Sequence, residues 1–175
     1  MRRLLLWLPF AVFAGLFALV AIGLYKPADR TVYSAMVGKP LPAFALPPML
    51  PGKPGVAAIM YRDGKPRLIN VFASWCIPCA AEAGQLKRLQ ELGVVIDAVA
   101  IRDTGPNIQG FLDRYGDPFD RIGDDPESAV QLALGSAGVP ESFVVDGKGI
   151  VRLQHVGEIR ADDVPKILAA IEQSK

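Results

Sequence analysis

The chain has 175 residues, of which 51% are hydrophobic, and 19 lysines and arginines nearly balance 18 aspartates and glutamates. This balance gives no basic surface for nucleic acid, and the length suits one globular domain behind a short N-terminal segment. The chain contains two cysteines and a single histidine, His155. These are too few ligands for a structural zinc site, which normally has four.

An uncharged apolar run opens the chain. Two arginines precede residues 4–24, a run of 21 residues without a charge. Crossing a bilayer takes about 20 apolar residues, whereas the core of a signal peptide has about 7–15. We therefore predict that residues 1–25 form an uncleaved transmembrane anchor; a cleaved signal peptide is the alternative. The arginines should stay in the cytoplasm, which places the rest of the chain across the membrane, in a bacterium in the oxidising periplasm.

Two further segments follow the predicted anchor. Residues 26–37 read as a short tether, and residues 38–175 as the folded domain. The domain begins with a proline-rich stretch, 38–48, which should be extended or form a sheet edge because proline cannot donate to a ladder. After it, apolar residues 57–61 and a second apolar run from Arg67 flank an Asp-Gly turn signal, a pattern that predicts a short hairpin.

The next elements alternate between strand and helix. Residues 68–73 predict a buried strand, residues 76–92 a helix closed by Gly93, and residues 94–101 a second buried strand. Near-continuous apolar strands separated by a helix are typical of an α/β sheet covered on both faces.

The C-terminal half predicts shorter helices and a hairpin. We expect a helix over 108–115 and another that Asp124 or Asp125 caps and that runs to about Leu134. A β-hairpin should follow, with strands 143–145 and 150–154 around an Asp-Gly turn. A final amphipathic helix should span 162–173.

The two cysteines form a Cys-x-x-Cys motif, Cys76 and Cys79, at the predicted start of a helix. There the helix dipole and the free backbone N–H groups favour a thiolate on the first cysteine. Alanine follows Cys79, so the motif lacks the histidine of a c-type haem carrier. A purely structural disulfide is the alternative, but it would close almost no loop and would stabilise the fold little. The motif therefore favours a redox-active dithiol.

Three features resemble the thioredoxin superfamily. They are the order of the elements, the Trp75-Cys-x-x-Cys sequence after the first core strand, and Val139-Pro140 before the hairpin. Together with the N-terminal anchor, residues 39–47 and residues 138–146 are similar to the membrane-tethered thiol:disulfide interchange proteins of cytochrome c maturation, the DsbE (CcmG) family. The resemblance covers about residues 38–175. It implies a thioredoxin-like α/β fold, a central mixed sheet flanked by helices and preceded by one transmembrane helix.

The resemblance also implies roles for individual residues. Cys76 would be the nucleophile and Cys79 the resolving thiol, and Pro140 would follow a cis peptide bond beside the dithiol. Asn70 stands where thioredoxins usually carry a buried aspartate, and its amide cannot take a proton from Cys79; it could simply be a buried, hydrogen-bonded amide. Trp75 would pack over the dithiol or cover the edge of the core.

Two carboxylates are candidates for a base that assists Cys79. Glu82 lies one helical turn after Cys79, and Glu141 follows Pro140. The alternative for Glu82 is a first-turn carboxylate that interacts with the helix dipole.

The resemblance implies a bacterial inner-membrane protein whose periplasmic domain reduces the haem-binding cysteines of apocytochrome c, or of a thiol protein in its maturation. A membrane thiol reductase would supply the electrons. The dithiol would need no cofactor and no metal. The alternatives are a general thiol:disulfide exchange protein, an oxidant, and a tethered binding module with a structural disulfide. The absence of histidine between the cysteines disfavours the oxidant.

Overall fold

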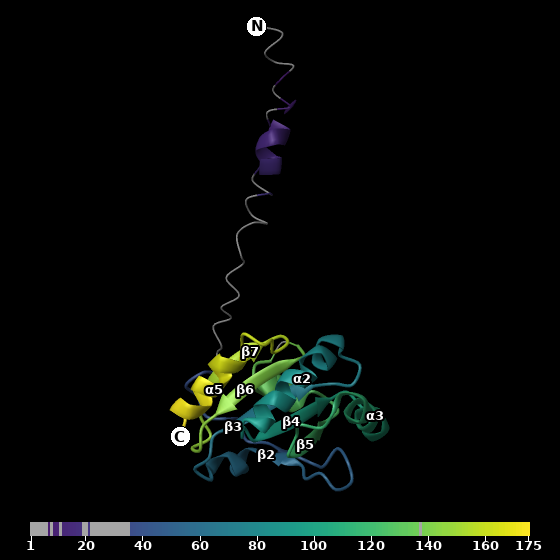
Figure 1. The fold of residues 1–175 in the computed structure, drawn as a ribbon, viewed down its shortest axis with the longest axis vertical. Helices are drawn as coiled ribbons and strands as arrows, with labels where there is room; N and C mark the ends of the chain where they lie inside the picture. Colours follow the sequence, from purple (N-terminus) through teal and green to yellow (C-terminus); the bar gives the residue numbers. More distant parts are fainter. Residues whose placement is uncertain (1–6, 8, 11, 19–20, 22–35, 137) are drawn as a thin grey trace. The chain divides into compact units, whose positions relative to one another are not determined.

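The computed structural model describes residues 7, 9–10, 12–18, 21, 36–136 and 138–175 (Figure 1). The chain divides into two compact units, Met1–Tyr33 and Ser34–Lys175. In the first unit, residues 12–18 are helical. Among the described residues no helix is both long and apolar enough to span a membrane. Most of the predicted anchor and tether, including the two arginines, lies outside the described residues.

The second unit is built on a five-stranded mixed sheet with the strand order β5-β4-β3-β6-β7. The central strand is β3, Arg67–Phe72, which is parallel to β4, Ile96–Ile101, and antiparallel to β6, Glu141–Val145. All residues of β4 and β6 are buried. Such continuous burial is expected for strands that helices cover on both faces, and the predicted α/β sheet is confirmed.

The helix that carries the cysteines follows the central strand. It is α2, Ile77–Glu91, with Cys76 as its N-cap and Pro78 in its first turn, where the missing N–H of proline leaves no hydrogen bond unmade. Gly93 ends it with φ +88°, a conformation that glycine adopts without strain. The predicted helix over 76–92 is thus confirmed at both ends.

The predicted hairpin around Asp63-Gly64 is wrong. Residues Ala58–Arg62 form a 3₁₀ helix, η1, and the strand before it, β2 (Val56–Ala57), pairs with β1 (Ala45–Leu46) from the proline-rich stretch. Proline cannot donate to a central ladder, and this stretch is accordingly found at an edge, as predicted.

Strand β5, Arg121–Asp125, was not predicted from the sequence. It pairs in parallel with β4 on one side. On the other side the proline-rich stretch accepts at Pro47 O from Asp124 N–H, and Met49, directly after the stretch, donates its N–H to Ile122 O. Both edges of this polar strand are therefore hydrogen-bonded, which compensates for its low content of apolar residues.

The remaining elements agree with the predicted order. They are α3 (Gly105–Tyr115), α4 (Ala129–Ala133), the hairpin partner β7 (Val151–Val156), and α5 (Val164–Gln173). The Asp125 carboxylate accepts the N–H groups of the first residues of α4, which confirms it as the predicted cap. Helix α2 lies between α3 and α5 and contacts both (Figure 1). Helix α4 packs against β4 and β5.

Candidate active site

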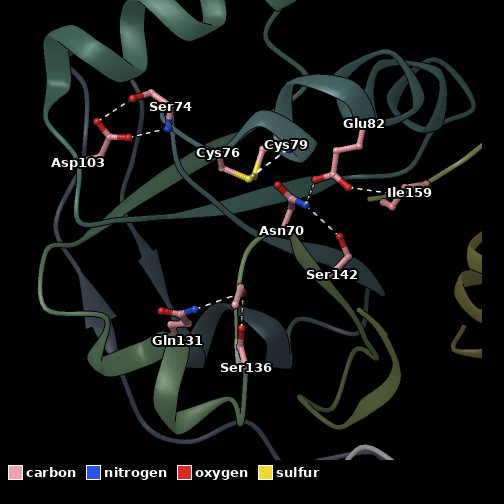
Figure 2. Close-up of a disulfide and its surroundings, with 11 residues drawn as sticks. Asn70, Ser74, Cys76, Cys79, Glu82, Asp103, Gln131, Ser136, Ser142 and Ile159 are labelled. Atoms are coloured by element: carbon pink, nitrogen blue, oxygen red, sulfur yellow. Dashed lines mark hydrogen bonds between the residues drawn. A yellow bond between two sulfur atoms is a disulfide. The ribbon is translucent and has the colours of Figure 1, made fainter. Parts of the chain in front are cut away.

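Cys76 and Cys79 form a disulfide at the start of α2, with an S–S distance of 2.07 Å (Figure 2). In this disulfide Cys76 is 5% and Cys79 2% exposed. The N–H of Cys79 donates to the Cys76 sulfur at 3.2 Å. This N–H of the first helical turn, which also donates to the Cys76 carbonyl at 3.2 Å, is thus directed at the sulfur of Cys76, where it can stabilise a thiolate.

A buried polar network lies on the inner face of α2 (Figure 2). Glu82 is fully buried, and its carboxylate accepts from Asn70 Nδ2 and from the N–H of Ile159, both at 2.9 Å. Asn70 Nδ2 also donates to Ser142 Oγ at 3.0 Å. Asn70 is therefore the buried, hydrogen-bonded amide considered from the sequence. Glu82 is directed into the core, so its interpretation as a first-turn carboxylate at the helix dipole is wrong.

Burial determines the protonation of Glu82. Removal from water disfavours the charged carboxylate and raises its pKa from 4.5 to about 7, against the opposing effect of the hydrogen bonds from Ile159 and Asn70. Asn70 Oδ1 is buried and has no hydrogen-bond partner among the described residues. Rotation of the amide by half a turn would present this oxygen to a protonated Glu82, so the network can accommodate both protonation states of the carboxyl group.

A second network holds the loop before the dithiol (Figure 2). The Asp103 carboxylate accepts from the N–H of Ser74 at 2.6 Å, from its hydroxyl at 3.0 Å, and from the N–H of Thr104 at 2.8 Å. Next to it the indole N–H of Trp75 donates to the Arg102 carbonyl at 3.2 Å, and Trp75 is 56% exposed. The indole is thus fixed toward the end of β4, where it helps to form the wall of a groove.

Pro140 lies at the start of β6 and is buried. The Val139–Pro140 bond is cis, as the resemblance implied. The next residue, Glu141, pairs with Val71 near the end of β3, so Pro140 lies at the end of the sheet from which the chain runs to the cysteines. Glu141 is buried and its Oε1 accepts from Gln154 Nε2 on β7, which gives this carboxylate a structural partner on the neighbouring strand.

The loop before Pro140 is held from α4. Gln131 Nε2 donates to the Gly138 carbonyl at 3.2 Å, and Ser136 Oγ donates to the same oxygen at 2.9 Å (Figure 2). Between this loop and Trp75 lies a groove of about 210 Å³, lined by the following residues: Trp75, Ile101, Arg102, Gln131, Leu132, Ser136, Gly138 and Val139.

The structure thus brings Cys76, Cys79, Asn70 and Glu82 together under one helix and places Trp75 and Pro140 at the same end of the sheet. Asp103 and Arg102 were missed from the sequence. The one sequence feature that could have indicated these two residues is their position immediately after a predicted buried strand, because the loops of an α/β sheet often contain functional residues.

A dithiol at the start of the helix that follows the central strand of such a sheet defines a thioredoxin-like thiol:disulfide oxidoreductase. Residues 36–171 match the Redoxin family. The chain is 37% identical to the thiol:disulfide interchange protein HelX of Rhodobacter capsulatus, over 95% of this chain and 94% of that protein. It is 36% identical to the thiol:disulfide interchange protein DsbE of Pseudomonas fluorescens, over 100% and 99% of the two chains. The chain belongs to the DsbE (CcmG) family of thiol:disulfide interchange proteins.

Solved structures agree with this assignment. A crystal structure described as a thiol:disulfide interchange protein DsbE from Chlorobium tepidum superposes with a TM-score of 0.64 at 27% identity, over 79% of this chain and 96% of that one. A DsbF homologue from Corynebacterium diphtheriae gives a TM-score of 0.64 at 26% identity, over 83% and 96%. The thioredoxin-like fold and the central mixed sheet flanked by helices are therefore confirmed.

Proposed function

We propose that this protein reduces the haem-binding cysteines of apocytochrome c, or those of a maturation partner, during cytochrome c biogenesis. The observation that carries the chemistry is the Cys79 N–H directed at the Cys76 sulfur at a helix start. Membership of the DsbE (CcmG) family supports the choice of substrate and the direction of electron flow.

In this reaction the reduced protein attacks a disulfide of its partner. The Cys76 thiolate bonds to one partner sulfur, the partner S–S bond breaks, and its other sulfur leaves as a thiolate that takes up a proton. Cys79 then loses its proton and attacks the Cys76 sulfur, which forms the Cys76–Cys79 disulfide and releases the second partner thiol. Two electrons pass from the dithiol to the partner, and the partner gains two protons.

Glu82 is the proposed proton acceptor for Cys79. The two residues are three positions apart on α2 and both are buried on its inner face. Asn70 cannot accept the proton at its amide nitrogen, which leaves Glu82 as the ionisable member of the Asn70–Glu82–Ser142 network. A pKa of about 7 allows Glu82 to hold or release a proton near neutral pH.

The proposed setting follows from the first unit of the chain. The apolar run of residues 4–24 would anchor the protein in the bacterial inner membrane and leave the domain in the periplasm. A membrane thiol reductase would return the Cys76–Cys79 disulfide to the dithiol. The dithiol would be the redox group of the protein, without a further cofactor.

The test is genetic and chemical. Deletion should lower holocytochrome c, and an added small-molecule thiol should restore part of it. In the same cells the Cys79→Ser variant should retain apocytochrome c or a maturation protein in a mixed disulfide. If the deletion left cytochrome c levels normal while secreted proteins accumulated free thiols, the proposed role as a reductant would be contradicted and a role as an oxidant indicated. A reduction potential nearer about −120 mV than about −270 mV would point the same way.

A further inference from the structure

The groove beside the dithiol contains one cation that the proposed reaction does not use. Arg102 is exposed and lines this groove together with Trp75 and Val139. Its side chain is not free to rotate, because Nε donates to Ser128 Oγ at 3.0 Å and Ser128 is fully buried. The guanidinium is therefore held at a defined place in the groove wall, which is how proteins present arginine to a carboxylate.

The backbone around Arg102 supports a functional interpretation. Arg102 has φ +47° and Ser128 has φ +58°, both in the left-handed region that residues other than glycine seldom adopt. Each of the two also donates its N–H to the carbonyl of Asp125. Unusual backbone conformations that the surrounding structure maintains are concentrated at functional sites. Here they fix Arg102, which lines the groove, and Ser128, the buried residue that holds its side chain.

The acidic residues next to this guanidinium do not neutralise it. The Asp103 carboxylate is occupied by Ser74 and Thr104. The Asp125 carboxylate is occupied by the N–H groups at the start of α4. In the part of the chain that the structure describes, no carboxylate forms an ion pair with Arg102. The terminal nitrogens of the guanidinium remain available to a ligand from outside.

We infer that Arg102 determines specificity by binding a carboxylate of the partner polypeptide close to its reacting cysteine. The inference rests on the proposed function, because the partner segment that enters this groove is the one whose disulfide Cys76 attacks. A segment that lies extended beside Val139 would place a neighbouring side chain toward the groove wall. An aspartate or glutamate there would pair with the fixed guanidinium.

The test uses reduced full-length protein and synthetic peptides that contain an intramolecular Cys-Ala-Ala-Cys disulfide. Glutamate is placed in turn at each of the flanking positions, and every such peptide has a matched glutamine peptide. At one or more positions the glutamate peptide should be reduced about threefold faster than its match, the size expected for a single exposed ion pair. Added salt should remove the difference.

Two variants assign the preference to Arg102. Arg102→Gln should abolish the glutamate preference, so that each glutamate peptide is reduced at the rate of its matched glutamine peptide. The matched control, Arg88→Gln, removes the same charge from the exposed face of α2 and should keep the preference. Should Arg102→Gln fail to fold, Arg102→Met, which keeps much of the length of the side chain without its charge, takes its place with the same expected result.

Three results would overturn the inference and leave the thiol:disulfide exchange intact: no glutamate preference at any position, a preference that persists in Arg102→Gln, or equal slowing of both peptide sets. Equal slowing would mean that Arg102 acts on the Cys76 thiolate and not on the partner. Failure to reduce any peptide would overturn the proposed function itself, and the inference with it.

Discussion

Replacement of Glu82 by glutamine should remove a large part of the pH dependence of stability. In the wild type the folded state holds a proton on Glu82 more tightly than the unfolded chain does, because burial raises the pKa of the carboxyl group from 4.5 to about 7. The associated stability is fully present below about pH 4.5 and is lost as the pH rises through about 7. The free energy of unfolding should therefore fall across this interval.

The magnitude follows from the size of the pKa rise. An increase from 4.5 to about 7 is about 2.5 pH units, and at about 1.36 kcal/mol per unit it corresponds to about 3 kcal/mol. Glu82→Gln keeps the shape of the side chain. Its carbonyl can accept the Ile159 N–H, while a rotated Asn70 amide can offer its unpaired Oδ1 to the new N–H₂ group. Between pH 5 and pH 8 the free energy of unfolding of the variant should therefore rise by about 2.5 kcal/mol relative to that of the wild type, because part of the loss already occurs below pH 5.

The assay is urea unfolding of the oxidised full-length protein at a series of pH values. Glu91→Gln, at the exposed C-terminal end of the same helix, is the matched control and should follow the wild-type profile. The difference between Glu82→Gln and wild type isolates this one carboxyl group from every other titrating residue. A difference that stays constant within about 0.5 kcal/mol over this range would refute the burial argument.

Other consequences can be tested separately. Cys76→Ser should abolish exchange, whereas Cys79→Ser should still form stable mixed disulfides; preferential alkylation of Cys79 in the reduced protein would contradict these roles. Asp103→Ala should lower the free energy of unfolding by about 2 kcal/mol, because it leaves the Ser74 and Thr104 N–H groups without their carboxylate. It should also slow exchange, and normal stability with a normal rate would exclude the proposed support of the loop. Gly147→Ala should destabilise by about 2 kcal/mol in thermal unfolding, since a Cβ there would lie 2.2 Å from the Gly64 backbone; an unchanged melting temperature would contradict this contact.

Local sequence patterns predicted the parts of the fold that depend on local chemistry. The helix after Cys76 has an N-terminal proline and a closing glycine. The continuous apolar runs of β3, β4 and β6 indicate strands at the centre of the sheet, where both faces are buried. The cysteine spacing likewise identified the reacting atoms. These features are visible because their causes lie within a few residues of one another.

Features that depend on distant parts of the chain were not predicted. Strand β5 is polar, and its hydrogen bonds come from β4 on one side and from the proline-rich stretch, about 75 residues earlier, on the other. Residues 57–61 looked like half of a hairpin, but most of them form the 3₁₀ helix η1, and the strand before it, β2, pairs with the two-residue strand β1. Spacing suggested Glu82 as a base, but the burial that raises its pKa comes from packing, and the Ile159 N–H that opposes this rise lies 77 residues further along the chain.

The position of β3 in the middle of five strands has a consequence for how the protein meets its partners. A strand hydrogen-bonded on both sides belongs to the part of a domain whose amide hydrogens exchange last, since it opens only with the whole sheet. The reacting sulfurs are attached a few residues beyond this strand. The dithiol is therefore presented by the stiffest part of the protein, and adaptation during complex formation falls to the partner. An unfolded polypeptide, such as a cytochrome before it acquires haem, can supply that adaptation at once, whereas a folded protein would first have to expose its disulfide.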